Sequence, residues 1–124
     1  MQTILIVDDD SELRSSLATA LADEYAVHAV SSGSAAVRFL EETAVDMILL
    51  DMLMAEGDGF TVLSHTAGLD PRPRVVILTV VDQVDKAVKA MRLGASDYVV
   101  KPCHLDRLRN VLRRALNAVP SPVA

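Results

Sequence analysis

The hydrophobic positions of the chain gather first into five short segments rich in valine, isoleucine and leucine. These segments are Thr3–Val7, Ala26–Val30, Met47–Leu50, Arg74–Thr79 and Tyr98–Val100. Most of them are nearly continuous apolar runs, without regular alternation of apolar and polar residues. Continuous runs are typical of strands that are buried on both faces, as in a parallel sheet. The pattern therefore predicts five strands in one central parallel sheet.

Between these segments the apolar residues recur at helical spacing. The stripes are Leu13, Leu17 and Leu21; Ala36, Val37 and Leu40; Val84, Ala87, Val88 and Met91; and Leu105, Leu108, Val111, Leu112 and Ala115. The stretch from Gly59 to Thr66 is shorter, and its helical pattern is weaker. Strands and helices thus alternate, which predicts an α/β fold: a (βα)5 doubly wound parallel sheet with right-handed crossovers.

Polar residues at the ends of these stripes predict where helices begin and end. Asp10 and Ser32 each stand before a helical stripe and suit the N-cap position. Asp82, with Asp85 three residues later, resembles a capping box and predicts another helix start. Gly94 follows a stripe and suits the position just past a helix end.

Length and composition narrow the class of protein. The 124 residues fit one domain, and 51% hydrophobic content excludes a disordered chain. No apolar run reaches the roughly 20 residues of a membrane span, and we see no signal peptide, so we expect a cytoplasmic protein. The net charge of −5 argues against direct nucleic-acid contact by this domain. The domain is expected to cover residues 1–117, with 118–124, which hold two prolines, as a tail or the start of a linker.

The chemistry of the chain collects where the predicted strands end. The residues that follow or close these strands are Asp8, Asp9 and Asp10, then Asp51, Thr79 and Lys101. In open α/β sheets, ligands bind beyond the carboxyl ends of the strands. Each residue alone also has a plain structural interpretation: a solvated acid, a helix cap, a β-forming threonine or a surface lysine. Their convergence from four strand ends favours a functional site.

The residue types at this edge suit one kind of chemistry. Three carboxylates, from Asp8, Asp9 and Asp51, suit Mg²⁺, which prefers oxygen ligands. A carboxylate beside such a cation can act as a nucleophile towards phosphorus. Lys101 and the hydroxyl of Thr79 could then hold phosphoryl oxygens.

Four sequence pieces resemble a known family. "VDDD", "LLDMLMAEGDG", "VVILT" and "GASDYVVKP" resemble, in order and spacing, the receiver domain of bacterial two-component response regulators. The resemblance spans nearly the whole chain. It implies a flavodoxin-like fold with strand order 2-1-3-4-5.

The resemblance also implies a role for each site residue. The implied roles are Asp51 as phosphoacceptor; Asp9, Asp8, Asp51 and the backbone oxygen of Leu53 as ligands of Mg²⁺ or Mn²⁺; Lys101 and Thr79 as contacts of the phosphoryl group; and Thr79 with Tyr98 as the switch pair. Pro102 is expected to follow a cis peptide bond, and Asp58 with Gly59 to form the turn before the third helix.

The implied function is signalling rather than enzymatic turnover. A sensor histidine kinase or a phosphotransfer protein of a phosphorelay would donate the phosphoryl group. The surface of the fourth helix, fifth strand and fifth helix would then change and recruit an output partner or a second copy of the chain. An ATPase or DNA-binding effector domain beyond this chain is a further expectation.

The sequence departs from the family pattern in three respects, which involve four positions. Ala55 replaces a usual proline, and Val80 a usual small residue. Leu53 and Val81 take the positions that flank the attacking water, and neither side chain can orient water. We therefore expect the phosphorylated form to lose its phosphoryl group slowly.

Several features carry other interpretations. "DDDS" leaves open a Mg²⁺-dependent phosphatase of the haloacid-dehalogenase type, with Asp8 as nucleophile, and the fold class leaves open a flavin-binding module. Cys103 is expected to pack as a small hydrophobic residue. The arginines of the last stripe, Arg107, Arg109, Arg113 and Arg114, are expected to form a solvated helix face.

Overall fold

The structure is a computed structural model, and it describes residues 1–52, 54 and 59–117. The strands are β1 (Thr3–Val7), β2 (Ala26–Val30), β3 (Met47–Asp51), β4 (Arg74–Val80) and β5 (Asp97–Lys101). The helices are α1 (Ser11–Leu21), α2 (Gly33–Glu42), α3 (Gly59–Ala67), α4 (Val84–Arg92) and α5 (Leu105–Asn117), with a short 3₁₀ helix η1 (Val81–Gln83) before α4. Within the described ranges, no helix is long and apolar enough to cross a membrane.

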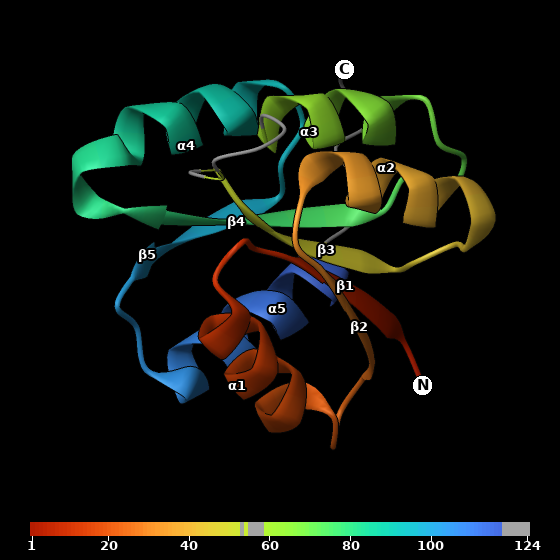
Figure 1. Cartoon of the computed structure of the whole chain (residues 1–124). Coiled ribbons are helices and arrows are strands. Elements are labelled where there is room, and N and C mark those ends of the chain that lie inside the picture. The colour runs from red at the N-terminus through yellow and green to blue at the C-terminus, as the bar shows by residue number, and fades with distance from the viewer. Residues whose placement is uncertain (53, 55–58, 118–124) are drawn as a thin grey trace.

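The five strands form one parallel sheet in the order β2-β1-β3-β4-β5. Helices α1 and α5 cover one face of the sheet, and α2, α3 and α4 cover the other (Figure 1). The predicted fold class and strand order are therefore confirmed. The predicted strands are also confirmed, and three of them extend by a residue or two, so that Asp51 closes β3 and Lys101 closes β5.

The central strands β1, β3 and β4 are buried on both faces, which explains their continuous apolar runs. In β1, Ile4 and Ile6 pack in the core beneath α1 and α5, whereas Leu5 and Val7 pack in the core beneath α2, α3 and α4. All four side chains are fully buried. Because side chains alternate between the two faces of a strand, those of β1 pack into two separate cores. A rigid sheet of this kind fixes the positions of the residues that follow its strands.

The helix starts confirm two of the three predicted caps. The carboxylate of Asp10 accepts hydrogen bonds from the amides of Glu12 and Leu13, at 3.0 and 3.2 Å. The hydroxyl of Ser32 accepts the amide of Ala35 at 3.1 Å. Both side chains therefore satisfy amides that the first helical turn leaves without partners.

The predicted cap at Asp82 is wrong. Asp82 lies inside η1, and α4 begins after Gln83, which makes no side-chain capping bond. The reason is the length of β4, which continues to Val80 because that residue pairs with Lys101 of β5. The chain then turns at once through the 3₁₀ helix, so strand pairing overrides the local capping signal.

The end of α4 matches the expectation for Gly94. This glycine has φ +110°, a conformation that other residues rarely adopt. The amide of Gly94 donates to Met91 and the amide of Ala95 donates to Ala90, the two bonds of a Schellman motif. Arg72 packs against Gly94 and donates to the carbonyl of Leu93 at 3.0 Å, which fixes the end of α4 against the entry to β4.

Three of the four α5 arginines, Arg107, Arg113 and Arg114, are exposed, as expected for a solvated helix face, whereas Arg109 is only partly exposed. Arg109 donates to the carbonyl of Ala20 at 2.7 Å, near the end of α1. Arg113 makes two bonds to the carboxylate of Glu24, at 3.0 and 2.6 Å. Arg114 contacts Asp97 at 3.1 Å. These bonds connect α5 to the end of α1, to the segment between α1 and β2, and to the start of β5.

Candidate functional site

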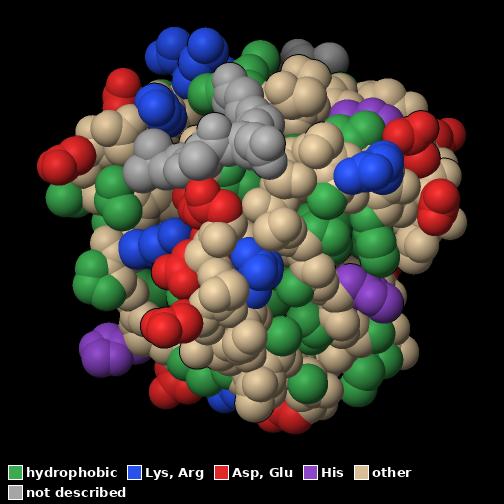
Figure 2. Space-filling view, viewed as in Figure 1, with side chains coloured by type: hydrophobic (Ala, Val, Ile, Leu, Met, Phe, Trp, Pro, Cys, Tyr) green, Lys and Arg blue, Asp and Glu red, His purple; other side chains and the backbone are tan. Residues whose placement is uncertain are grey.

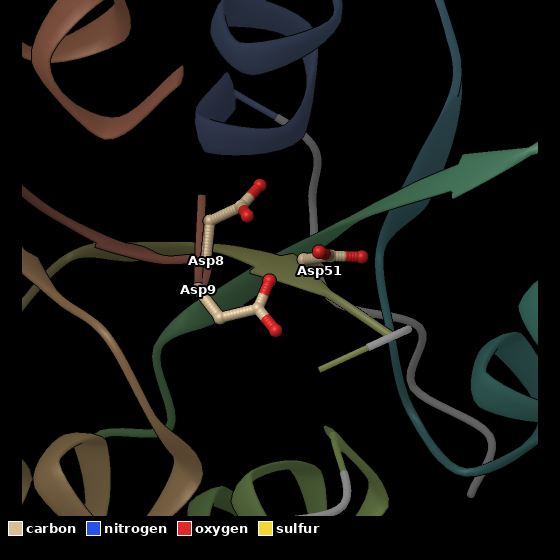
Figure 3. A group of neighbouring side chains, drawn as sticks. All are labelled: Asp8, Asp9 and Asp51. Carbon is tan, nitrogen blue, oxygen red and sulfur yellow. The ribbon is translucent and has the colours of Figure 1, made fainter. Parts of the chain in front are cut away.

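Three carboxylates converge at the carboxyl edge of the sheet. The register pairs Val7 with Leu50, so the next residue of each strand, Asp8 or Asp51, reaches the same edge. Asp8, Asp9 and Asp51 each offer an oxygen, and these oxygens lie within 4.8 Å of one another. Figure 3 shows the three side chains reaching from the strand ends into one region. The structure thus brings together the three acids that the sequence singled out.

Lys101 lies between two of these acids. Its ammonium is 3.2 Å from a carboxylate oxygen of Asp8 and 3.6 Å from one of Asp51. Asp8 is 1% exposed and Asp51 is 5% exposed, so both would be costly to bury as charges without such a partner. Asp9 is exposed, and acidic and basic side chains lie side by side where the strands end, at the left of the view in Figure 2.

The donor set fits a divalent cation. Three carboxylates and one ammonium sum to a formal charge of −2, that is, three minus one. The ligands are hard oxygens, and the exposure of Asp9 leaves a solvent-facing side for bound water, as Mg²⁺ and Mn²⁺ prefer. The predicted ligand Leu53 lies outside the described residues, as do Ala55 and Asp58.

Thr79 lies at the end of β4, next to the acids. Asp51 pairs with Leu78, and Thr79 is the following residue. The side chain is fully buried, and its hydroxyl lies 3.3 Å from the carbonyl of Val80 and 3.2 Å from the carbonyl of Gln83. The hydroxyl therefore donates towards the start of α4.

Tyr98 lies on the same side of the sheet as Thr79. It pairs with Ile77, two residues before Thr79, and paired residues of parallel strands share a face. Its side chain is half-buried and packs against the core beneath α2, α3 and α4. The two predicted switch residues are thus diagonal neighbours beside α4. The Lys101–Pro102 peptide bond is cis, as expected.

An apolar hollow of about 560 Å³ opens beside Lys101, between α1 and α5. Its lining includes Leu13, Leu17, Val80 and Cys103. Burial raises the pKa of the Cys103 thiol, which favours the neutral, unreactive form. Cys103 also packs against the core beneath α1 and α5. This packing agrees with the expectation of a small hydrophobic residue.

The structure also reveals a site neighbour that the sequence pattern did not single out. The guanidinium of Arg14 donates to the backbone carbonyl of Asp8 at 2.8 Å. An arginine one turn into a helix carries no sequence signal for such a bond, because the partner is a backbone atom.

The chain is similar to curated regulatory proteins. It is 38% identical over 114 residues to regulatory protein AtoC of Escherichia coli strain K12, which covers 91% of this chain and 25% of that protein. It is 42% identical over 107 residues to the alginate biosynthesis transcriptional regulatory protein AlgB of Pseudomonas aeruginosa, covering 86% and 24%. The chain thus spans about a quarter of the length of these relatives.

Solved structures share the fold. The receiver domain of NtrX from Brucella abortus superposes with a TM-score of 0.87 at 29% identity, covering 94% of this chain and 99% of that one. The signal receiver domain of a Luxo repressor protein from Vibrio parahaemolyticus has a TM-score of 0.85 at 30% identity, covering 93% and 89%. Residues 4–113 match the family described as the response regulator receiver domain. The chain therefore belongs to the response regulator receiver domain family.

Proposed function

We propose that Asp51 accepts a phosphoryl group from a phosphohistidine of a sensor histidine kinase or a phosphotransfer protein. The observation that carries the proposal is the setting of Asp51. Its carboxylate closes β3 at the carboxyl edge of the sheet, shares one region with Asp8 and Asp9, and lies 3.6 Å from the ammonium of Lys101. A buried nucleophile beside a cation, at an edge open to a partner, suits acceptance of a phosphoryl group.

The transfer forms one bond and breaks one. A carboxylate oxygen of Asp51 attacks phosphorus, the bond from phosphorus to the histidine nitrogen breaks, and its electron pair stays on the imidazole. Lys101 holds an oxygen of the arriving group with a charge-assisted hydrogen bond. Mg²⁺ bound by Asp8, Asp9 and Asp51 would supply positive charge that offsets the charge of the phosphoryl oxygens.

Thr79 and Tyr98 form the switch in this proposal. A phosphoryl group on Asp51 offers strong acceptors one strand away from the Thr79 hydroxyl. The hydroxyl then leaves the carbonyls of Val80 and Gln83, to which it now lies at 3.3 and 3.2 Å. Tyr98 moves inward as Thr79 shifts. The equilibrium between two conformations of the surface formed by α4, β5 and α5 then changes.

The output acts through that surface. Val88, Met91 and Leu93, in or just after α4, are 43%, 37% and 48% exposed, which suits contact with an effector or a second copy of the chain. The relatives named above are described as regulatory or transcriptional regulatory proteins, and they are about four times longer than this chain. We infer that the chain controls an effector domain, of DNA-binding or ATPase type, in the cytoplasm.

Slow self-dephosphorylation is part of this proposal. Val81 is 71% exposed and apolar, so it offers no hydrogen bond to a water that approaches the phosphorylated residue.

The phosphatase alternative has less support. Asp8, its nucleophile, is 1% exposed and already accepts bonds from Lys101 and from the amide of Asp10.

A phosphotransfer assay tests the proposal. The chain is incubated with a labelled histidine kinase and Mg²⁺, and with Mg²⁺ removed by chelation. We expect label in the wild type with Mg²⁺, and none in Asp51→Asn. Equal label in both proteins would overturn the assignment of Asp51.

A further inference from the structure

Arg14 contacts the backbone at the acidic site. Its guanidinium nitrogen Nη1 lies 2.8 Å from the carbonyl oxygen of Asp8. The backbone of Arg14 is fixed in α1, where its amide donates to the carbonyl of Asp10 at 3.0 Å. The guanidinium therefore reaches back from a rigid helix to the end of β1.

The carbonyl of Asp8 belongs to the peptide unit that joins Asp8 to Asp9. This unit is planar, so its orientation sets one backbone angle of Asp8 and one of Asp9. In a regular strand, the side chains of successive residues point to opposite faces. Both carboxylates nevertheless offer an oxygen to one cluster with Asp51. The orientation of this peptide unit therefore directs the side chains of Asp8 and Asp9 towards the same cluster.

Other bonds hold the loop on either side of that unit. The amide of Asp8 donates to the carbonyl of Val30 at 3.2 Å. The amide of Asp10 donates to a carboxylate oxygen of Asp8 at 2.9 Å. In the part of the chain that the structure describes, the bond that we find on the carbonyl between them comes from Arg14.

We propose that Arg14 is a positioning residue, which presets Asp8 and Asp9 for a divalent cation by fixing the peptide unit between them. The inference rests on the proposed function, since that function places the cation there. In this proposal Arg14 acts through the backbone of Asp8 and is neither a metal ligand nor a contact of the phosphoryl group. Outer contacts that orient metal ligands typically change metal affinity by about 10- to 100-fold.

The test measures binding of Mg²⁺ to the intact chain by isothermal titration calorimetry, because the chain has no tryptophan to report it. The variants are Arg14→Ala and Arg14→Lys. The matched control is Arg38→Ala, an exposed arginine of α2. We expect Arg14→Ala to weaken Mg²⁺ binding about tenfold, and Arg14→Lys by less, because lysine keeps a donor but loses the planar fork. Arg38→Ala should bind as the wild type does.

A second readout separates positioning from general destabilisation. Phosphoryl incorporation is followed as a function of Mg²⁺ concentration. Arg14→Ala should need more Mg²⁺ for half-maximal rate, and should regain a rate within about twofold of wild type at saturation. A purely structural role would lower the melting temperature without Mg²⁺ and leave the Mg²⁺ requirement unchanged.

Wild-type affinity for Mg²⁺ in folded Arg14→Ala would overturn the inference and leave the proposed function standing. If Arg14→Ala does not fold, unchanged affinity in Arg14→Lys would overturn it equally. If the wild type binds no Mg²⁺ and takes up no phosphoryl group, the proposed function fails, and the inference fails with it.

Discussion

The ammonium of Lys101 lies 3.2 Å from a carboxylate oxygen of Asp8, although 93 positions separate the two residues in the sequence. β1 and β5 are not neighbours in the sheet, yet their ends meet at one site. One lysine thereby stabilises two buried carboxylates, since it also lies 3.6 Å from Asp51. The remaining negative charge gives a physical reason for a cation to bind there.

Mg²⁺ should stabilise the folded chain against heat. A ligand at ten times its dissociation constant, bound to the folded state alone, contributes about 1.4 kcal/mol. We expect a rise in melting temperature on addition of Mg²⁺, measured by calorimetry or circular dichroism. Asp9→Ala should abolish the rise with little cost to the metal-free protein, because Asp9 is exposed. A full rise in Asp9→Ala would contradict its role as a ligand.

Asp10 should matter for stability but not for the metal. Loss of its cap in Asp10→Ala should destabilise the chain by about 1 kcal/mol in urea denaturation, whereas Asp10→Asn should cost far less, because asparagine also caps. Both variants should keep the Mg²⁺-dependent rise. Loss of that rise in Asp10→Asn would mean that Asp10 also belongs to the metal site.

Asp10 and Asp82 illustrate what could be predicted from the sequence. The capping signal was correct at Asp10, where a strand ends and a helix starts with no competing contact. It was wrong at Asp82, because pairing of Val80 with Lys101 extends β4 and leaves Asp82 within η1. A local sequence pattern does not specify the length of a strand when that length depends on pairing with a neighbouring strand.

The contacts of the site also divide into those that the sequence predicts and those that it does not. The sequence predicts that one site contains Asp8, Asp9, Asp51 and Lys101. Parallel strands end at one edge of the sheet, and each of these residues stands at a strand end. The bond from Arg14 to the backbone of Asp8 could not be predicted, nor could the bonds from Arg109 to Ala20 in α1 and from Arg113 to Glu24 after it. These contacts depend on how each helix packs against its neighbours, which the hydrophobic pattern does not specify.

The Thr79 hydroxyl should be needed for switching and not for phosphorylation. Thr79→Val keeps the shape of the side chain and removes the donor to Gln83, at a cost of about 1 kcal/mol. Phosphoryl incorporation should stay near wild type, while the change in amide exchange of η1 and α4 on phosphorylation should disappear. Thr79→Ser, which keeps the hydroxyl, should retain that change. A normal response in Thr79→Val would remove the hydroxyl from the mechanism.

The contact between Glu24 and Arg113 should make stability depend on pH. The hydrogen bond from Arg113 lowers the pKa of the Glu24 carboxyl below its usual 4.5. A lowered pKa in the folded state stabilises the fold above the usual value, and this contribution is lost as pH falls through the lowered value. Glu24→Gln should therefore melt below wild type at neutral pH.

The difference in melting temperature between Glu24→Gln and wild type should shrink as the pH falls below 4.5. It should also shrink in high salt, because the pair lies at the surface. The control is Glu41→Gln, an exposed glutamate of α2. If the melting temperature of Glu24→Gln differs from that of wild type by the same amount at neutral and acidic pH, the charge of Glu24 does not contribute to stability.

The most direct test of the account is to locate the phosphoryl group on the chain. The protein is phosphorylated by a histidine kinase with Mg²⁺, the acyl phosphate is trapped chemically, and the modified residue is identified by peptide mass spectrometry. We predict that the group is on Asp51, in the peptide that contains the end of β3. A group on Asp8, as a phosphatase of the haloacid-dehalogenase type would carry, or on any other residue, would contradict the account.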